Sequence, residues 1–218
     1  MNKKCLLSLC AIVLILYVMY QEITYIQQFV ENHVNGRPSA AVTLSSNVKK
    51  ELHRSLQMIP AEEGPFTFID FGCAEGNVLA EVYRQKHAHI NSYVGVELEK
   101  QLTDIAQKRF AKNDMVQIYN MDMKEYTYAD TPTILFIYEP LWELETPLAQ
   151  TIYLDILSNI PTTNPSFYII YVSGVLKKHM NVAFFDRLHF RKLRHAKCNR
   201  VLGLKHNSIY LFKQTIQR

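Results

Sequence analysis

A short segment rich in small residues carries the clearest chemistry in this sequence. Asp70, Gly72, Ala74 and Gly76 stand at alternate positions, from the end of an apolar run over 66–71 to the start of a helical pattern. Small residues at a strand-to-helix turn let backbone N–H groups and the helix N-terminus approach a ligand closely. The spacing is not the G-x-G-x-x-G of dinucleotide sites, and no Gly-Lys-Ser/Thr follows as in phosphate-binding loops. The segment therefore predicts a binding turn for another kind of ligand.

A carboxylate is expected at the same edge of the fold. Glu97 ends the next apolar run, Tyr93-Val-Gly-Val-Glu97, and follows Gly72 by 97 − 72 = 25 positions. A carboxylate at the end of a parallel strand can accept both hydroxyl protons of a ribose. Asp122 follows a third run, over 115–120, although an Asp at that point can also simply cap a turn.

These segments resemble motif I and the next strand ends of the class I S-adenosylmethionine-dependent methyltransferases, over about residues 45–215. Ala74 stands in for the middle glycine of motif I. The resemblance implies a methyltransferase that binds S-adenosylmethionine, with Glu97 on the ribose and Asp122 with apolar neighbours at the adenine. The cofactor-binding residues it implies are Asp70, Gly72, Cys73, Ala74, Glu75, Gly76, Asn77, Glu97, Leu98, Met121, Asp122 and Met123.

The methyl acceptor is expected at the end of the fourth strand. Tyr138-Glu139-Pro140-Leu141-Trp142 resembles the Asp/Asn-Pro-Pro-aromatic signature of amino-group methyltransferases, but departs from it at Glu139 and Leu141. A longer carboxylate favours a cationic amine, which suggests a protein lysine rather than a nucleic-acid base, and aromatic neighbours suit that cation. Catalytic roles are assigned to Glu139, Tyr138 and Trp142. The alternative is that Trp142 packs in the core and the glutamates lie exposed at a helix start.

The N-terminus predicts a membrane anchor. Lys3 and Lys4 precede an apolar run over 5–20 that contains neither proline nor glycine. Sixteen residues at about 1.5 Å each span roughly 24 Å, which is short of a ~30 Å hydrocarbon core. Small residues that would mark a signal-peptide cleavage site are missing, so an uncleaved single-pass anchor is favoured over a signal peptide or an interfacial helix. We expect an anchor over 1–30, a linker over 31–44 and a methyltransferase domain over 45–218.

The charge pattern and the location of the cofactor predict opposite sides of the membrane for the domain. The two lysines precede the segment, so the positive-inside rule puts the domain on the far side. S-adenosylmethionine is an intracellular metabolite, and we therefore expect the domain on the cytoplasmic or matrix side. The order of anchor and domain is similar to membrane-associated protein-lysine methyltransferases of the mitochondrial type, and the glycine-loop and Val-Glu motifs are similar to the histone-lysine branch that lacks a SET domain.

The apolar pattern between these motifs predicts alternating strands and helices. Val48, Leu52 and Leu56 describe an amphipathic helix capped at Ser45 or Ser46. Further helices are expected over 76–87, 99–112 and 145–159, and strands over 66–71, 92–97, 115–120, 133–138 and 166–172, with a β-hairpin over 187–198 and 207–214. This order predicts a three-layer, doubly wound α/β fold with a mostly parallel seven-stranded sheet, a C-terminal antiparallel hairpin and a preceding hydrophobic helix.

Composition excludes several other classes. The four cysteines form no CxxC pair and the eight histidines show no ligand spacing, so neither a disulfide framework nor a metal site is expected. The net charge of +4 hides a basic segment, 177–218, with eleven Lys/Arg and one acid (11 − 1 = +10). That segment is either a solvated face or a surface for phosphate, anionic lipid or an acidic partner. Nucleic acid is a disfavoured partner.

Two rival functions stay open. One is a catalytically silent member of the fold that serves as a membrane adaptor, and the other is a methyltransferase for a small-molecule, lipid or nucleic-acid acceptor. An adaptor does not need Asp70, Gly76 and Glu97 together. Their joint presence therefore favours a chain that binds the cofactor and methylates a protein or small-molecule amine.

Overall fold

The computed structural model describes residues 44–138, 146–161, 166–173, 180–198 and 208–215. Contacts divide the chain between Ala40 and Ala41, and every described residue belongs to the unit that runs from Ala41 to Arg218. The expected anchor, 1–30, and nearly all of the expected linker lie outside the described residues. Within the described part, no helix is both long and apolar enough to cross a bilayer.

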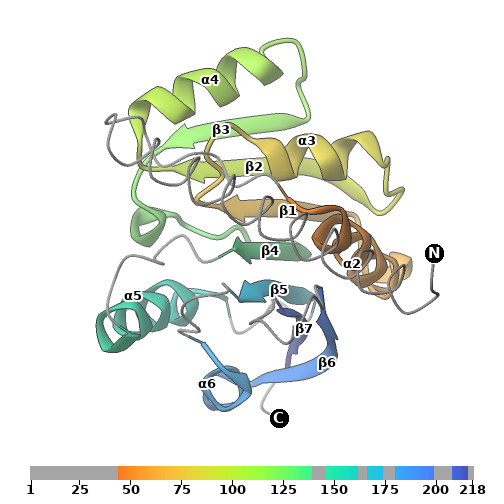
Figure 1. Ribbon diagram of the computed structural model, residues 1–218, viewed down its shortest axis with the longest axis vertical. Helices are drawn as coiled ribbons and strands as arrows, with labels where there is room; N and C mark the ends of the chain where they lie inside the picture. Colours follow the sequence, from red (N-terminus) through yellow and green to blue (C-terminus); the bar gives the residue numbers. More distant parts are fainter. Residues whose placement is uncertain (1–43, 139–145, 162–165, 174–179, 199–207, 216–218) are drawn as a thin grey trace, which may run out of the picture. The chain divides into compact units, whose positions relative to one another are not determined.

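Strands and helices alternate along the described chain, as Figure 1 shows. The elements are α2 (Ser46–Gln57), η1 (Ala61–Glu63), β1 (Phe66–Phe71), α3 (Asn77–Arg84), β2 (Ile90–Glu97), α4 (Lys100–Phe110), β3 (Val116–Asn120), η2 (Met123–Glu125), β4 (Thr133–Tyr138), α5 (Thr146–Ser158), β5 (Phe167–Ser173), α6 (Val182–Arg187), β6 (Phe190–Lys197) and β7 (Ser208–Gln214).

The strands form one seven-stranded sheet in the order β3-β2-β1-β4-β5-β7-β6. The pairs from β3 to β5 are parallel, whereas β7 runs antiparallel to both β5 and β6. Strands β1, β4 and β5 are buried almost throughout, as expected for strands covered on both faces. The predicted α/β class, parallel sheet and antiparallel C-terminal hairpin are confirmed.

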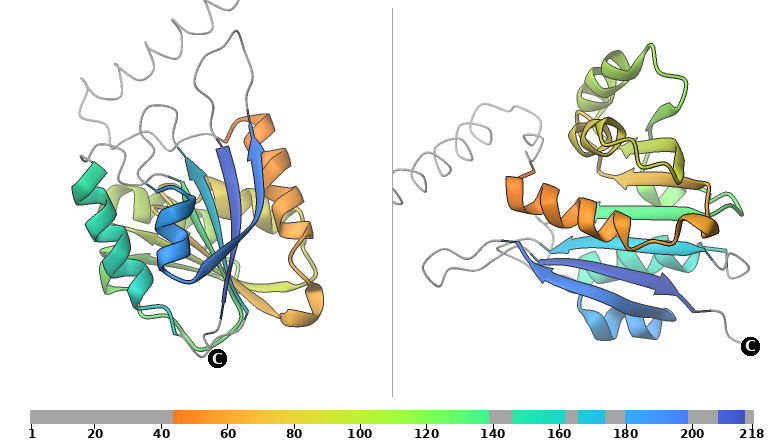
Figure 2. Two further views of the ribbon diagram at one scale, coloured as in Figure 1. Left: turned by 90° about the horizontal axis from the view of Figure 1, so that it is seen from below. Right: turned by 90° about the vertical axis from the view of Figure 1, so that its right-hand side faces the viewer.

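Helices cover both faces of this sheet (Figure 2). One apolar cluster joins α2 and α3 to one face, through residues such as Leu52 and Leu79. The other joins α5 and α6 to the opposite face, through residues such as Tyr153 and Phe185. Side chains alternate between the clusters along β1, where Phe68 belongs to the first cluster and Ile69 to the second. The sheet thus forms the middle of three layers.

The predicted boundaries are close to the observed ones, with a few local differences. Ser45 caps α2, because its hydroxyl accepts a hydrogen bond from Val48 N at 3.3 Å. Helix α3 ends at Arg84 rather than at 87, before a turn in which Lys86 adopts a positive φ of 49°. The six-residue helix α6 was not predicted, since its Phe-Phe pair is too short to show a helical period.

The carboxyl ends of the parallel strands lie at one edge of the sheet. Register places Phe71 beside Val96 and Glu97 beside Asn120. Tyr138, the last residue of β4, pairs with Val172 at the same edge. The segments expected to bind the cofactor and the acceptor therefore share this edge, where ligands of open α/β sheets bind.

Candidate functional site

The turn after β1 has a left-handed backbone at three alternate positions. Gly72 has φ of 71°, Ala74 of 47° and Gly76 of 75°. Hydrogen bonds fix the turn, because Gly72 N and Cys73 N both donate to Val96 O of the neighbouring strand, at 2.9 and 3.2 Å. Glycine adopts positive φ without the steric cost that a Cβ brings, so the course of the backbone explains Gly72 and Gly76, and Ala74 carries the smallest Cβ side chain at the position between them.

Close packing is a second reason for glycine in this region. A Cβ placed on Gly76 would lie 2.7 Å from Cε2 of Phe110, the last residue of α4. A Cβ on Gly95 of β2 would lie 2.7 Å from Sγ of Cys73. Neither space admits a larger side chain without movement of its neighbours, and the turn is therefore pressed closely against β2 and α4.

Glu97 joins this turn to the end of β2. Its Oε2 accepts a hydrogen bond from Ala74 N at 2.9 Å, and its Oε1 accepts one from Glu99 N at 2.8 Å. The side chain is half-buried. A carboxylate offers about four acceptor sites, so two backbone N–H groups leave it able to accept two hydroxyl protons as well. The predicted pairing of the small-residue turn with Glu97 is thus present as a direct contact.

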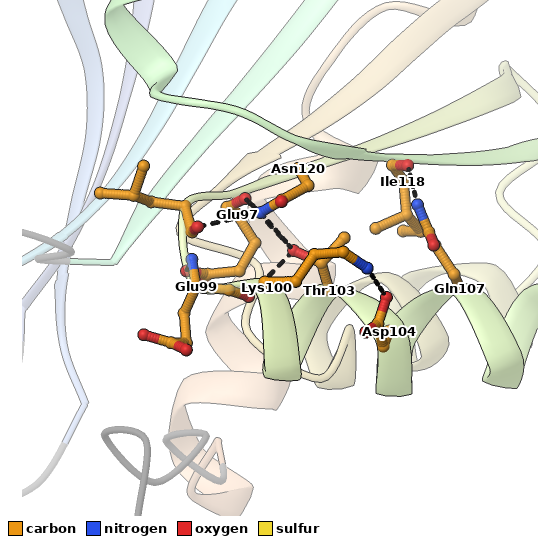
Figure 3. Close-up of polar contacts among 9 residues, drawn as sticks. Glu97, Glu99, Lys100, Thr103, Asp104, Gln107, Ile118 and Asn120 are labelled. Atoms are coloured by element: carbon orange, nitrogen blue, oxygen red, sulfur yellow. Dashed lines mark hydrogen bonds and ion pairs between the residues drawn. The ribbon is translucent and has the colours of Figure 1, made fainter.

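The backbone beside Glu97 is fastened by two side chains that sequence reasoning missed. Asn120 Nδ2 donates to Leu98 O at 2.9 Å and to Glu97 O at 3.1 Å. Thr103 of α4 is buried, and its Oγ1 lies 3.2 Å from Glu97 O and 3.0 Å from Glu99 O. Figure 3 shows these contacts converging on the turn between β2 and α4. The only sequence signal for Asn120 was its place at the end of a strand.

Asp70 lies inside the fold rather than on the surface of the site. It is 2% exposed, and its Oδ2 has no hydrogen-bond partner within the described part of the chain. Burial, and then the nearby negative charge of Glu97, raise the pKa of Asp70 well above its usual range. The neutral, protonated form of Asp70 is therefore favoured in these surroundings.

Cys73 is a packing residue of the turn. Its side chain is buried, and its Sγ contacts Ala74 O at 3.7 Å. Burial, followed by the charges of Asp70 and Glu97, raises the pKa of the Cys73 thiol above its usual range. A protonated thiol is a poor nucleophile, so the surroundings of Cys73 do not favour a covalent role.

Apolar side chains lie next to Glu97, where the adenine ring of the cofactor is expected. Leu98 is 69% exposed, the largest exposed fraction among the large apolar side chains of the described residues. Met121 and Met123 are half-buried against the second apolar cluster. Asp122 caps η2, because its Oδ1 accepts from Lys124 N at 2.9 Å, and its Oδ2 pairs with Lys124 Nζ at 3.1 Å. Asp122 thus caps a turn, as the sequence allowed, and its role at the adenine stays a prediction.

Of the remaining predicted site residues, three are described by the structure and two are not. Asn77 begins α3 and accepts a hydrogen bond from Arg109 Nη1 at 2.7 Å, and Glu75 lies half-buried in the turn. Tyr138 ends β4 and packs against the first apolar cluster. Glu139 and Trp142 lie outside the described residues. Among the described residues, no group of three or more His, Cys, Asp or Glu side chains could hold a metal ion.

The fold matches those of known methyltransferases. No protein-family model matches the sequence, and no curated protein matches it either. In structure, the chain is similar to the N-methyltransferase NodS from Bradyrhizobium japonicum WM9, with 14% identity, 78% of this chain and 99% of that chain covered, and a TM-score of 0.56. A complex of NodS with S-adenosylhomocysteine matches with 11% identity, 81% and 91% covered, and a TM-score of 0.58.

Two further methyltransferases also match in structure. Magnesium protoporphyrin IX methyltransferase (ChlM) from Synechocystis PCC 6803, solved with S-adenosylmethionine bound, matches with 11% identity, 78% of this chain and 80% of that chain covered, and a TM-score of 0.57. A methyltransferase from Leishmania major matches with 14% identity, 84% and 77% covered, and a TM-score of 0.58. The described domain has the Rossmann-like fold of S-adenosylmethionine-dependent methyltransferases, as the sequence predicted.

Proposed function

We propose that this chain is an S-adenosylmethionine-dependent methyltransferase that acts on an amine, with a protein lysine as the favoured acceptor. The contact between Glu97 and the turn after β1 is the observation that carries the proposal. It brings together a half-buried carboxylate, a close backbone turn and the exposed apolar side chain of Leu98 at the carboxyl edge of a parallel sheet. Adenosine needs two of these features, an acceptor pair for its ribose and an apolar surface for its base, and the close turn leaves room for the rest of the cofactor.

The residues at this edge fit the cofactor from end to end. Glu97 would accept the ribose hydroxyls, and Leu98 would lie against the adenine with Met121. The turn from Gly72 to Gly76 would pass close to the amino-acid portion, and the buried carboxyl of Asp70 lies just before it. The cofactor would supply a methyl group already activated on a sulfonium, so the chain itself need only hold the acceptor in line and in its neutral form.

The acceptor end of the proposal rests on the segment after β4. Tyr138 ends that strand at the same edge as Glu97, and Glu139 follows it directly in the sequence. A carboxylate there would attract a lysine ammonium. Once that ammonium has lost a proton to solvent, the carboxylate would accept hydrogen bonds from the neutral amine and so orient its lone pair toward the methyl carbon, with S-adenosylhomocysteine as the leaving group. Tyr138 and Trp142 would favour the same cation through their ring faces. NodS is described as an N-methyltransferase, which is compatible with an amine acceptor.

Membrane attachment is the second part of the proposal. The apolar run over 5–20 supports an N-terminal anchor, and the cofactor's origin supports a domain on the cytoplasmic or matrix side. Protease added to intact membranes should then digest the domain when it is applied from that side. Full protection there, with digestion from the opposite side, would separate the domain from its cofactor and contradict the enzymatic proposal.

Methyl transfer itself is the direct test. The full chain would be incubated with S-adenosylmethionine labelled in its methyl group. Proteins extracted from the cells that produce the chain naturally would be added as candidate acceptors. We expect label in lysine side chains, lost in Glu139→Gln while that variant still binds S-adenosylhomocysteine as tightly as the parent chain. Glu143→Gln, four residues along the same segment, is the matched control and should keep its activity. Full activity of Glu139→Gln would remove Glu139 from the mechanism. Label in another side chain or in lipid would show that this group, and not lysine, is the acceptor.

A further inference from the structure

We propose that Asn120 is a positioning residue for the cofactor, acting through Glu97 rather than on the cofactor itself. The inference rests on the proposed function, because it concerns how the ribose-binding carboxylate is presented. Asn120 ends β3 and stands beside Glu97 in the register of the parallel pair. Sequence reasoning had assigned binding roles to its neighbours Met121 and Asp122 but none to Asn120.

The side-chain amide of Asn120 contacts the turn that carries Glu97 and the helix that follows it. Its Nδ2 lies 3.1 Å from Glu97 O, 2.9 Å from Leu98 O and 3.2 Å from Thr103 Oγ1. The amide has two protons for these three acceptors, so they are shared. Figure 3 shows the Asn120 side chain reaching across from β3 to the start of α4. One side chain thus ties the end of β3 to the end of β2 and to α4.

Thr103 completes this attachment from the helix side. It is fully buried, and its hydroxyl lies within hydrogen-bond distance of both Glu97 O and Glu99 O. Met121 N also donates to Glu97 O, at 3.1 Å. The carbonyl of Glu97 is therefore held by donors from two different elements, and the Cα of Glu97 has little freedom to move relative to β3.

This attachment matters because Glu97 and Leu98 are the two residues expected to contact adenosine. A carboxylate that accepts two ribose hydroxyls must stay within a few tenths of an ångström of its place, which requires a fixed backbone below it. Asn120 fixes that backbone through the carbonyls of both residues. Its own exposure shows that it is not needed to fill the core. Removal of the amide should therefore weaken cofactor binding more than it weakens the fold.

Gln107 offers a matched control. It lies on α4, the helix of Thr103, and its Nε2 donates to Ile118 O of β3, the strand of Asn120, at 3.0 Å. Its hydrogen bond is of the same side-chain-to-backbone type, but it lies away from the Glu97 turn (Figure 3). Asn120→Ala removes side-chain bonds that join β3 to the end of β2 and to α4, and Gln107→Ala removes one that joins α4 to β3. Only the bonds of Asn120 fasten Glu97.

The test is calorimetric titration of the full chain with S-adenosylhomocysteine, with the melting temperature measured in parallel. We expect Asn120→Ala to weaken binding by about tenfold, since two shared hydrogen bonds are lost, and Gln107→Ala by less than about twofold. Thr103→Val, which removes the hydroxyl but keeps the shape, should weaken binding in the same direction. The melting temperatures of Asn120→Ala and Gln107→Ala should be similar.

A double-mutant cycle separates positioning from direct contact. If Asn120 acts through Glu97, Asn120→Ala should have little further effect in a Glu97→Ala background. Additive losses in that cycle, or equal losses for Asn120→Ala and Gln107→Ala, would overturn the inference while the proposed function stands. A folded parent chain that binds no S-adenosylhomocysteine would instead overturn the proposed function, and the inference with it.

Discussion

Two carboxylates lie near each other at the carboxyl edge of the sheet, in very different surroundings. Glu97 is half-buried and accepts two backbone hydrogen bonds, whereas Asp70 is buried with an oxygen that has no partner in the described part of the chain. Burial and the charge of Glu97 raise the pKa of Asp70. One carboxylate is thus ready to accept hydroxyl protons, while the other needs a proton or a cationic neighbour.

The raised pKa of Asp70 predicts how stability changes with pH. A carboxyl whose pKa is higher in the folded than in the unfolded chain stabilises the fold below its ordinary value of 3.8, and that contribution is lost as pH rises through the folded pKa. Asp70→Asn removes this titration, so its melting temperature should exceed that of the parent chain by an increasing margin as pH rises. Parallel melting temperatures across the pH range would contradict this prediction.

The positions of individual site residues could be predicted where the backbone fixes the interval between them. Asp70, Gly72, Gly76 and Glu97 could be placed because a strand-to-helix turn and the next strand end impose fixed intervals. Asn120 and Thr103 could not, because their hydrogen bonds join elements far apart in the sequence, 120 − 103 = 17 residues for the pair itself. The use of Asp122 as a cap for η2 was likewise one of two alternatives that spacing alone cannot separate.

At the scale of elements, the packing of α3 against α4 depends on Gly76. Gly76→Ala adds a Cβ at 2.7 Å from the Phe110 ring and places a side chain at φ of 75°. We expect a loss of about 1 to 3 kcal/mol in the free energy of unfolding, measured with urea. Phe110→Leu in the same chain should recover part of that loss by making room, but not the part due to backbone strain. A fully additive double variant would show that the ring contact does not limit this position.

Strand and helix types were predictable because most elements have a clear apolar period. Val48, Leu52 and Leu56 all lie fully buried on α2, as their spacing required. Helix α6 was missed because six residues hold fewer than two turns. The sequence predicted a mostly parallel sheet with a C-terminal hairpin but no strand order. Nothing local in the chain indicates that β7 inserts between β5 and β6.

At the scale of the whole domain, basic residues near the C-terminus partly serve the fold. Arg194 of β6 pairs with Glu51 of α2, and Lys213 of β7 lies 2.7 Å from Glu63 of η1. Tyr168 of β5 also donates to Glu63, at 2.9 Å. These contacts join the first described elements to the last. Part of the basic segment therefore stabilises the fold, in addition to the two roles that the sequence suggested for it. Arg191, Lys192 and Lys197 of β6 are exposed.

Glu81 of α3, which contacts His53 of α2, predicts the response of the domain to acid. Burial would raise the pKa of Glu81, but hydrogen bonds from His53, Gln85 and Arg84 outweigh it and lower the pKa to about 2. A lowered pKa stabilises the fold above the ordinary value of 4.5, and this contribution is lost as pH falls toward 2. Glu81→Gln should therefore be less stable than the parent chain at neutral pH and equally stable near pH 2, as measured by urea unfolding.

The exposed Glu62 of η1 supplies the control for that experiment. Glu62→Gln should change stability by less than about 0.5 kcal/mol at either pH, as is usual for a surface position. A loss for Glu81→Gln that is the same at both pH values would mean that the charge of Glu81 is not what joins the two helices.

The central claim is that Glu97 and the turn after β1 form a working cofactor site. The most direct test is calorimetric titration of S-adenosylmethionine and S-adenosylhomocysteine into the full chain, with Glu97→Ala as the comparison. We expect saturable binding of one molecule per chain, weakened at least about tenfold by Glu97→Ala, because two hydrogen bonds to a charged acceptor are lost. Absence of binding by a folded chain, or equal binding by Glu97→Ala, would contradict the claim and favour a domain kept as a membrane adaptor.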